Sequence, residues 1–240
     1  MILEPSHFEL VKTFNIQFGV YIPDTKLPNI LTEDPETIKF ALTLIQEECK
    51  EFTKAYSEDD KIEQLDACID TCYVTLGMFA QMGSNMDEFH FNNPMLRKVD
   101  IEDCDSYDQL LKKKLQSIED MIRNLDYESV LKTLSAMYLT AMAIGKQLLK
   151  GYAEKKNINC HEAFNEVFNE IYDNNMTKFC KSEEEAIRTV KEKYGNHPEY
   201  KTPNYKKNEK GDLWIVYNEN PSKVLKSISW KEVSLDRFVF

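Results

Sequence analysis

The chain has 240 residues, and 42% of them are apolar, so it can bury a core and is not a disordered tail. Its net charge of −11 argues against a broad nucleic-acid-binding surface, because basic side chains supply most of that affinity. No apolar stretch is long enough to span a bilayer, and the N-terminus lacks the apolar run of a signal peptide. We therefore expect a cytoplasmic protein, in a host's cytoplasm if the source is viral, with no membrane attachment and no stable nucleic-acid binding.

The six cysteines are scattered through the chain and show no Cys-x-x-Cys pair. A zinc site that uses Cys68, Cys72, Cys160 and His161 is conceivable. Buried free thiols explain the same pattern with fewer assumptions, and we prefer that interpretation.

The spacing of apolar residues predicts a mainly helical protein. Glycine and proline are scarce, at 7 and 8, which favours helices joined by short connections. Segments 21–35 and 84–105 are expected to be irregular. In the tail, the β-prone runs 213–217 and 223–230 predict a hairpin. Helices are expected at about 6–20, 35–56, 60–82, 106–124, 127–150 and 161–175. A further helix is expected from Ser182 to near Gly195, because Ser182 can cap its start while Glu185 reaches back.

Acidic residues recur at helical spacing on two consecutive predicted helices. Residues three or four apart lie on one face of a helix, and the short connection between these helices predicts an antiparallel pair. The two acidic columns can then lie opposite each other. The residues are Glu47, Glu48 and Glu51 on the first helix and Glu63, Asp66 and Asp70 on the second.

These acids could simply be a solvated helix face, and for Glu47 and Glu63 alone that reading is the simpler one. Asp70 favours a site, because it is the only charged residue between Ala67 and Met86. A partly buried, unpaired carboxylate is unfavourable, and crowded carboxylates raise one another's pKa. A bound divalent cation resolves both problems, and oxygen ligands favour Mg²⁺, with Mn²⁺ as a possible substitute, over zinc.

A carboxylate-bound Mg²⁺ keeps coordination positions open for water and phosphate oxygens. Such an ion can polarise a phosphoryl group and orient an attacking water, while a carboxylate that is not a ligand takes the proton from that water. The acidic pattern therefore points to hydrolysis of a phosphate anhydride.

The acidic pattern resembles the metal motif of the all-α nucleotide pyrophosphohydrolases, the MazG-like and phosphoribosyl-ATP-pyrophosphohydrolase-like superfamily. That motif reads E-E-x-x-E and, after a spacer, E-x-x-D; the spacer here is at the short edge of the usual range. Other blocks resemble one branch of the superfamily in the right order. They are Phe14-x-x-x-Phe18-Gly19, the second metal helix from Asp66 to Gly77, the segment 174–179 and the basic segment 223–227.

The resemblance implies a helical bundle of the all-α pyrophosphohydrolase type, at 1–180, with a helical insertion at about 84–160. Residues 181–240 would form a small appendage of one helix and a β-hairpin. Relatives commonly form homo-oligomers of paired helices, so a homodimer or higher homo-oligomer is expected. The inserted helices at 106–150 could stand in for a partner's helices or extend a dimer interface.

By the same resemblance, the protein cleaves a nucleoside triphosphate to the monophosphate and pyrophosphate with Mg²⁺. The implied metal ligands are Glu48, Glu51, Glu63 and Asp66, with Asp70 as a ligand or a neighbour of the ligands. Glu47 would orient or deprotonate the attacking water, or act as a ligand.

Asn175, Lys178 and Lys226 are the implied phosphate contacts, although each lysine could be an ordinary surface residue. Asn15, Phe14 and Phe18 are candidate contacts for the base, although core packing is the simpler role for the two phenylalanines. The most specific form of this prediction is an enzyme directed at dUTP or dCTP. A phosphoribosyl-ATP-like metabolite as substrate, and a regulator that binds nucleotide without turnover, stay open.

Overall fold

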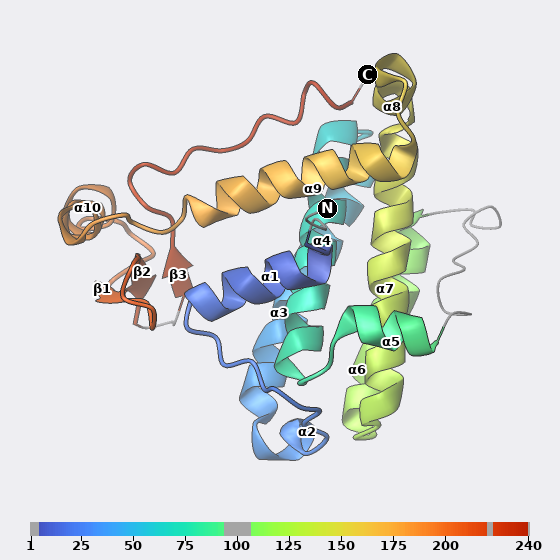
Figure 1. The fold of residues 1–240 in the computed structure, drawn as a ribbon, viewed down its shortest axis with the longest axis horizontal. Coiled ribbons are helices and arrows are strands. Elements are labelled where there is room, and N and C mark those ends of the chain that lie inside the picture. The colour runs from blue at the N-terminus through green and yellow to red at the C-terminus, as the bar shows by residue number, and fades with distance from the viewer. Residues whose placement is uncertain (1–4, 94–106, 220–222, 240) are drawn as a thin grey trace. The chain divides into compact units, whose positions relative to one another are not determined.

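The computed structural model describes residues 5–93, 107–219 and 223–239, and it is mainly helical with a three-stranded sheet near the C-terminus (Figure 1). The mainly α fold predicted from the sequence is confirmed. The described chain divides into two compact units: a helical unit within 1–12, 22–168 and 234–240, and a sheet unit within 13–21 and 169–233. The boundaries of these units fall within the first and ninth helices, whereas the sequence prediction divided the chain at residue 180.

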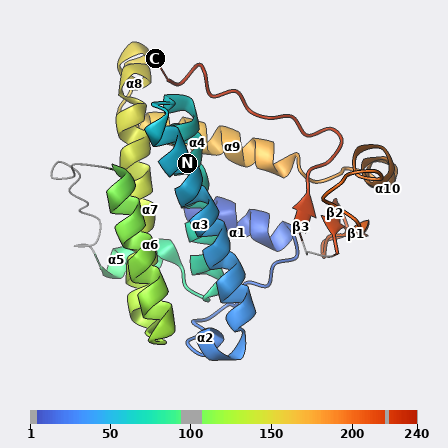
Figure 2. The ribbon, with the colours of Figure 1, turned by 180° about the vertical axis from the view of Figure 1, so that it is seen from behind.

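Four helices form the bundle of the helical unit: α3 (Pro35–Ser57), α4 (Lys61–Gln81), α6 (Tyr107–Arg123) and α7 (Tyr127–Leu148). Helix α4 packs against α3 and α7, and α6 packs against α7 and α3, so the four helices close on one another. Both views show them side by side (Figures 1 and 2). The predicted insertion therefore supplies the two helices that complete the bundle around the acidic pair.

The connection between α3 and α4 is tight and well capped. Asp34 begins α3 by accepting a hydrogen bond from the Thr37 N–H at 3.2 Å. Asp60 does the same for α4, accepting from the Glu63 N–H at 3.1 Å. Between the helices, Asp59 adopts a left-handed backbone with φ 53°, a conformation that Asp tolerates better than most residues. Three residues thus reverse the chain, and α3 and α4 run antiparallel as predicted.

Helix α7 is apolar around most of its circumference, as its sequence predicts. Val130, Leu134, Met137, Ala141 and Ile144 are all fully buried. Burial of large apolar side chains like these is the main source of stability for such a bundle. In α3 and α4, the large, fully buried side chains are Ile38, Ile45, Phe52, Leu65, Ile69, Leu76, Met78 and Phe79.

Several short helices fall where the sequence predicted irregular chain or one continuous helix. They have too few turns to show a periodic apolar pattern. Helix α5 begins after Asn85, whose side chain accepts from the N–H groups of Asp87 and Glu88. The part of the predicted irregular segment from 94 to 105 lies outside the described residues. The bounds of the remaining helices are α1 (His7–Gln17), α2 (Ile30–Glu33), α5 (Met86–Asn92), α8 (Lys150–Lys156) and α9 (Cys160–Met176).

The sheet unit holds α10 (Glu183–Arg188), the π-helical turn η2 (Thr189–Lys193), and strands β1 (Pro203–Lys207), β2 (Trp214–Asn218) and β3 (Lys223–Leu225) in antiparallel order β1-β2-β3. The predicted hairpin is β2–β3, which pairs Val216 with Leu225. The sequence did not predict β1, because this edge strand is too polar to show an apolar alternation.

The predicted cap at Ser182 is present. Its hydroxyl accepts from the Glu185 N–H at 3.1 Å, while the Glu185 carboxylate accepts from the Lys181 N–H at 2.8 Å. The returning bond of the capping box therefore reaches one residue before the cap.

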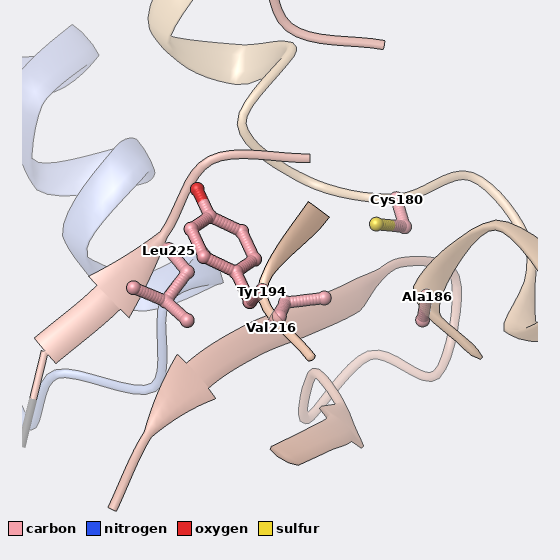
Figure 3. Packing of buried hydrophobic residues seen from close by; sticks show 5 residues of the cluster. All are labelled: Cys180, Ala186, Tyr194, Val216 and Leu225. Atoms are coloured by element: carbon pink, nitrogen blue, oxygen red, sulfur yellow. The ribbon is translucent and has the colours of Figure 1, made fainter. Parts of the chain in front are cut away.

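The sheet unit has a small apolar core in which the ring of Tyr194 packs with Val216 and Leu225 (Figure 3). Cys180 and Ala186 complete this cluster. A second cluster joins Phe18, Phe179 and Ile215.

The described cysteines are free thiols, and Cys49, Cys68, Cys72 and Cys180 are buried. Cys104 lies outside the described residues. Within the described ranges, no group of three His, Cys, Asp or Glu side chains is placed to hold a metal, so the zinc alternative has no support. No helix in the described ranges is both long enough and apolar enough to cross a membrane.

Candidate metal and nucleotide site

Glu48 is the centre of the acidic group. It lies on α3 directly before the buried Cys49 and one turn before the buried Phe52, so its side chain starts at the edge of the core. Its Oε2 atom is buried and has no hydrogen-bond partner among the described residues. A buried carboxyl oxygen without a partner is unfavourable and calls for an explanation.

Four further carboxyl groups lie around Glu48. Burial and the charges of Asp70, Glu51, Asp66 and Glu47, in that order of size, together raise the pKa of Glu48 to about 9. Two of these neighbours are on α3 and two are on α4, which shows that the antiparallel pair brings the two acidic columns together. At neutral pH and without a cation, the Glu48 carboxyl group is therefore protonated.

The five residues differ in exposure in a way that suits different tasks. Glu47 and Glu51 are exposed on α3, whereas Asp66 and Asp70 are half-buried on α4.

Glu63 differs from the other five. It is exposed in the first turn of α4, and it is not among the carboxylates that raise the pKa of Glu48. The structure thus brings together five of the six predicted acids and leaves Glu63 one turn nearer the α3–α4 connection.

The predicted nucleotide contacts lie in the sheet unit. Asn175 is buried, and its backbone carbonyl accepts from the Lys178 N–H at 3.0 Å. The Lys178 ammonium lies 5.9 Å from the centre of the Phe14 ring. Phe18 is buried against Phe179 and Ile215, so it contributes to the core of this unit.

Two more predicted residues of this unit are accessible. Asn15 is half-buried in α1, and Lys226 is exposed after β3, with its ammonium 3.7 Å from the centre of the Trp230 ring. Lys193 lies beside Lys226 and was not predicted from the sequence. In the run Lys191-Glu192-Lys193 it has the pattern of a solvated helix end, and no sequence signal distinguishes it from its neighbours.

Two consecutive, antiparallel helices of the bundle thus surround a buried carboxyl group with further carboxylates. In a comparison with known families, residues 25–92 match the phosphoribosyl-ATP pyrophosphohydrolase family. The match covers α3 and α4 with all six acids, so this part of the chain is similar to that family. It also supports a pyrophosphohydrolase-type function.

Among curated proteins, the chain is similar to an uncharacterized protein of Acanthamoeba polyphaga mimivirus. The two are 29% identical over 242 residues, which cover 94% of this chain and 92% of the viral protein. The similarity therefore extends beyond residues 25–92, through α6, α7 and the sheet unit. No solved structure gives a significant match to the chain.

Proposed function

We propose that the protein is a Mg²⁺-dependent nucleoside triphosphate pyrophosphohydrolase that cleaves a (d)NTP to the (d)NMP and pyrophosphate. The observation that carries this proposal is the buried, unpartnered oxygen of Glu48 with four further carboxyl groups around it. This arrangement is unfavourable in a protein that binds no cation, because burial and like charges both oppose ionisation. A divalent cation would offset both effects.

The residues present fit such an ion in their chemistry. Carboxylate oxygens are the ligands that Mg²⁺ prefers, and Mn²⁺ could replace it. Within the described ranges, no three acidic side chains yet stand at the spacing of a finished metal site. We therefore propose that Glu51 turns toward Glu48, Asp66 and Asp70 when the ion binds. Glu63 is a proposed ligand on the strength of the family motif alone.

When bound, the ion would polarise the phosphoryl group and neutralise charge on the leaving pyrophosphate. The chain's own residues have separate tasks. Glu48 must lose its proton to bind the ion, and Asp70 and Asp66 hold the ligand set in register across the helix pair. Glu47 is exposed on the same turn of α3, and as a general base it would take the proton of the attacking water.

The proposed substrate contacts are the amide of Asn175 and the ammonium groups of Lys178 and Lys226, which meet phosphate charge. Asn15 is proposed to act near the base, whereas the burial of Phe18 leaves it the core role. We also propose that the enzyme prefers dUTP or dCTP. We further propose that it is a homo-oligomer, and light scattering on the purified chain measures the oligomeric state.

The test is a panel of ribo- and deoxyribonucleoside triphosphates assayed with Mg²⁺ for release of pyrophosphate and of the monophosphate. Release of both products in equal amounts from at least one nucleotide is expected. Glu48→Ala and Asp66→Ala should each abolish turnover while the helical circular dichroism is retained. Full activity in both variants, or no hydrolysis of any nucleotide by the parent, would rule out the proposal.

The matched family keeps phosphoribosyl-ATP as a second candidate substrate. The same acidic site would serve either compound, so product analysis decides between them. Turnover of phosphoribosyl-ATP with none of any nucleoside triphosphate would favour this alternative.

A further inference from the structure

Two lysines of the sheet unit converge on one indole ring. The ammonium of Lys226 lies 3.7 Å from the centre of the Trp230 ring, and the ammonium of Lys193 lies 5.8 Å from the same point. Lys193 ends the π-helical turn η2, and Lys226 follows β3, so the two come from segments more than 30 residues apart. Their proximity is a product of the tertiary structure.

Hydrogen bonds hold this arrangement in place. The Lys193 ammonium donates to the backbone carbonyl of Ser227 at 2.7 Å. The Tyr194 hydroxyl donates to the Lys226 carbonyl at 3.0 Å and accepts from the Lys226 N–H at 3.1 Å. The Tyr194 ring is anchored in the core of the unit against Leu225 and Val216 (Figure 3). Lys193 and the backbone of Lys226 are therefore fixed by the core and do not drift as independent surface residues.

The charges of the two lysines are not balanced by acids. Within the described part of the chain, neither Lys193 nor Lys226 forms a salt bridge, although acidic residues outnumber basic ones by 41 to 30. Burial lowers the pKa of Lys193, and the neighbouring charge of Lys226 lowers it further. Like charges held together in this way repel each other.

Attraction to the aromatic ring explains one of the two lysines but not the pair. A single cation over an indole face is a common stabilising contact, as Lys207 shows 5.2 Å from the Trp214 ring in β2. A second ammonium adds repulsion at Trp230. The indole Nε1 of Trp230 is also buried and has no acceptor among the described residues. An anionic hydrogen-bond acceptor would interact favourably with both cations and with the unpaired N–H donor.

We propose that Lys193, Lys226 and the indole N–H of Trp230 form a binding site for a phosphate-type oxyanion, with Lys193 as a new basic member. Phosphate oxygens accept charged hydrogen bonds well, and two lysines suit an anion with two or more negative charges. The inference deepens the proposed function at Lys226, where the anion would be the polyphosphate of the substrate or the pyrophosphate product. Anion binding itself needs neither a metal nor turnover.

Fluorescence of Trp230 provides the test, because the chain has 2 tryptophans and Trp214→Phe leaves Trp230 as the only reporter. The full chain with this substitution is titrated with sodium pyrophosphate and with orthophosphate in EDTA, against sodium chloride at equal ionic strength. A saturable change with either phosphate and none with chloride is expected. The relative affinities then distinguish a polyphosphate site from a site for a single phosphate.

Lys193→Gln and Lys226→Gln should each weaken binding by about tenfold or more, as expected for the loss of one charged hydrogen bond. Lys193→Arg keeps the charge and should retain most of the affinity. Lys207→Gln is the matched control, because it removes an exposed lysine that lies over the aromatic ring at position 214, and it should change nothing. Circular dichroism and melting curves show whether each variant is folded.

Equal affinity in folded Lys193→Gln and in the parent would overturn the proposal, as would an equal response to chloride. Glu48→Gln separates this inference from the proposed function, since it removes the acidic site and should leave pyrophosphate binding unchanged. If turnover depends on Glu48 but not on Lys193, the anion site is contradicted and the proposed function stands. If the protein binds pyrophosphate but hydrolyses no nucleotide, the proposed function is contradicted and the anion site stands.

Discussion

Glu48 on α3 lies within electrostatic reach of Asp70 on α4, and Asp70 does more than any other neighbouring carboxylate to raise the pKa of Glu48. The two residues are 22 positions apart in the sequence and meet because the connection at residues 58–60 turns the chain back on itself. Without a cation, this contact destabilises the ionised form of Glu48. When a cation is bound, both carboxylates would be ligands of it. The same contact therefore makes both the stability of the protein and its affinity for the cation depend on pH.

Replacing Glu48 by Gln should change how the stability of the metal-free protein depends on pH. The pKa of Glu48 is raised from 4.5 to about 9 in the folded chain, so the folded state holds a proton that the unfolded state has lost throughout that window. The free energy of unfolding should therefore fall as pH rises through the window. The Glu48→Gln variant does not lose stability in this way. Near the upper end of this pH window it should therefore be more stable than the parent protein.

Urea unfolding in EDTA at both ends of the window measures this difference. Glu154→Gln, which removes an exposed acid from α8, is the control and should follow the parent at both pH values. A Glu48→Gln variant that loses stability with rising pH as steeply as the parent would contradict the assignment.

Magnesium should stabilise the parent protein and release a proton when it binds. The cation competes with the proton held by Glu48, so its affinity should increase with pH up to about 9. Titration calorimetry in two buffers of different ionisation enthalpy measures the released proton, and thermal melting with increasing MgCl₂ measures the stabilisation. Glu48→Gln should bind more weakly and release no proton. Equal Mg²⁺ stabilisation of this variant and the parent would show that the ion binds elsewhere.

Gly145→Ala should destabilise the helical unit although alanine is the better helix former. A Cβ at position 145 on α7 would lie 2.6 Å from Cε2 of the buried Phe164 ring on α9. Overpacking of this kind typically costs about 1–3 kcal/mol, which exceeds the gain of about 1 kcal/mol from helix propensity.

Denaturant unfolding measures the change. Gly151→Ala, at an exposed position of α8, should show the propensity gain without the clash. Equal stabilisation by both substitutions would show that α7 and α9 do not approach each other as described.

Lys178→Gln should weaken nucleotide binding without removing the metal site. Its ammonium is proposed to contact phosphate, and loss of one charged hydrogen bond should raise KM by about tenfold. Mg²⁺-induced thermal stabilisation of this variant should match that of the parent, since the acids belong to α3 and α4. Steady-state kinetics with the preferred nucleotide test the first expectation. An unchanged KM would remove Lys178 from the substrate contacts.

The sequence contained enough information for the fold class, the long helices and the acidic columns. Helical periodicity is a local property, and α3, α4 and α7 are long enough to display it over several turns. The spacing of Glu48 and Glu51 and of Asp66 and Asp70 placed each pair on one face, and the short connection then required the helices to be antiparallel. The short helices α2 and α5 and the polar edge strand β1 lack such repeats, so they could not be predicted.

Only the tertiary structure decided which acids act together and which basic residues meet. The exclusion of Glu63 from the group around Glu48 depends on how far each side chain lies along the packed helix pair, which one-dimensional spacing does not specify. The approach of Lys193 to Lys226 depends on the fold of the sheet unit, where η2 and the segment after β3 share one core. Pattern reveals which face a residue occupies. Burial and proximity arise from packing between distant segments, and these raise the pKa of Glu48 and lower the pKa of Lys193.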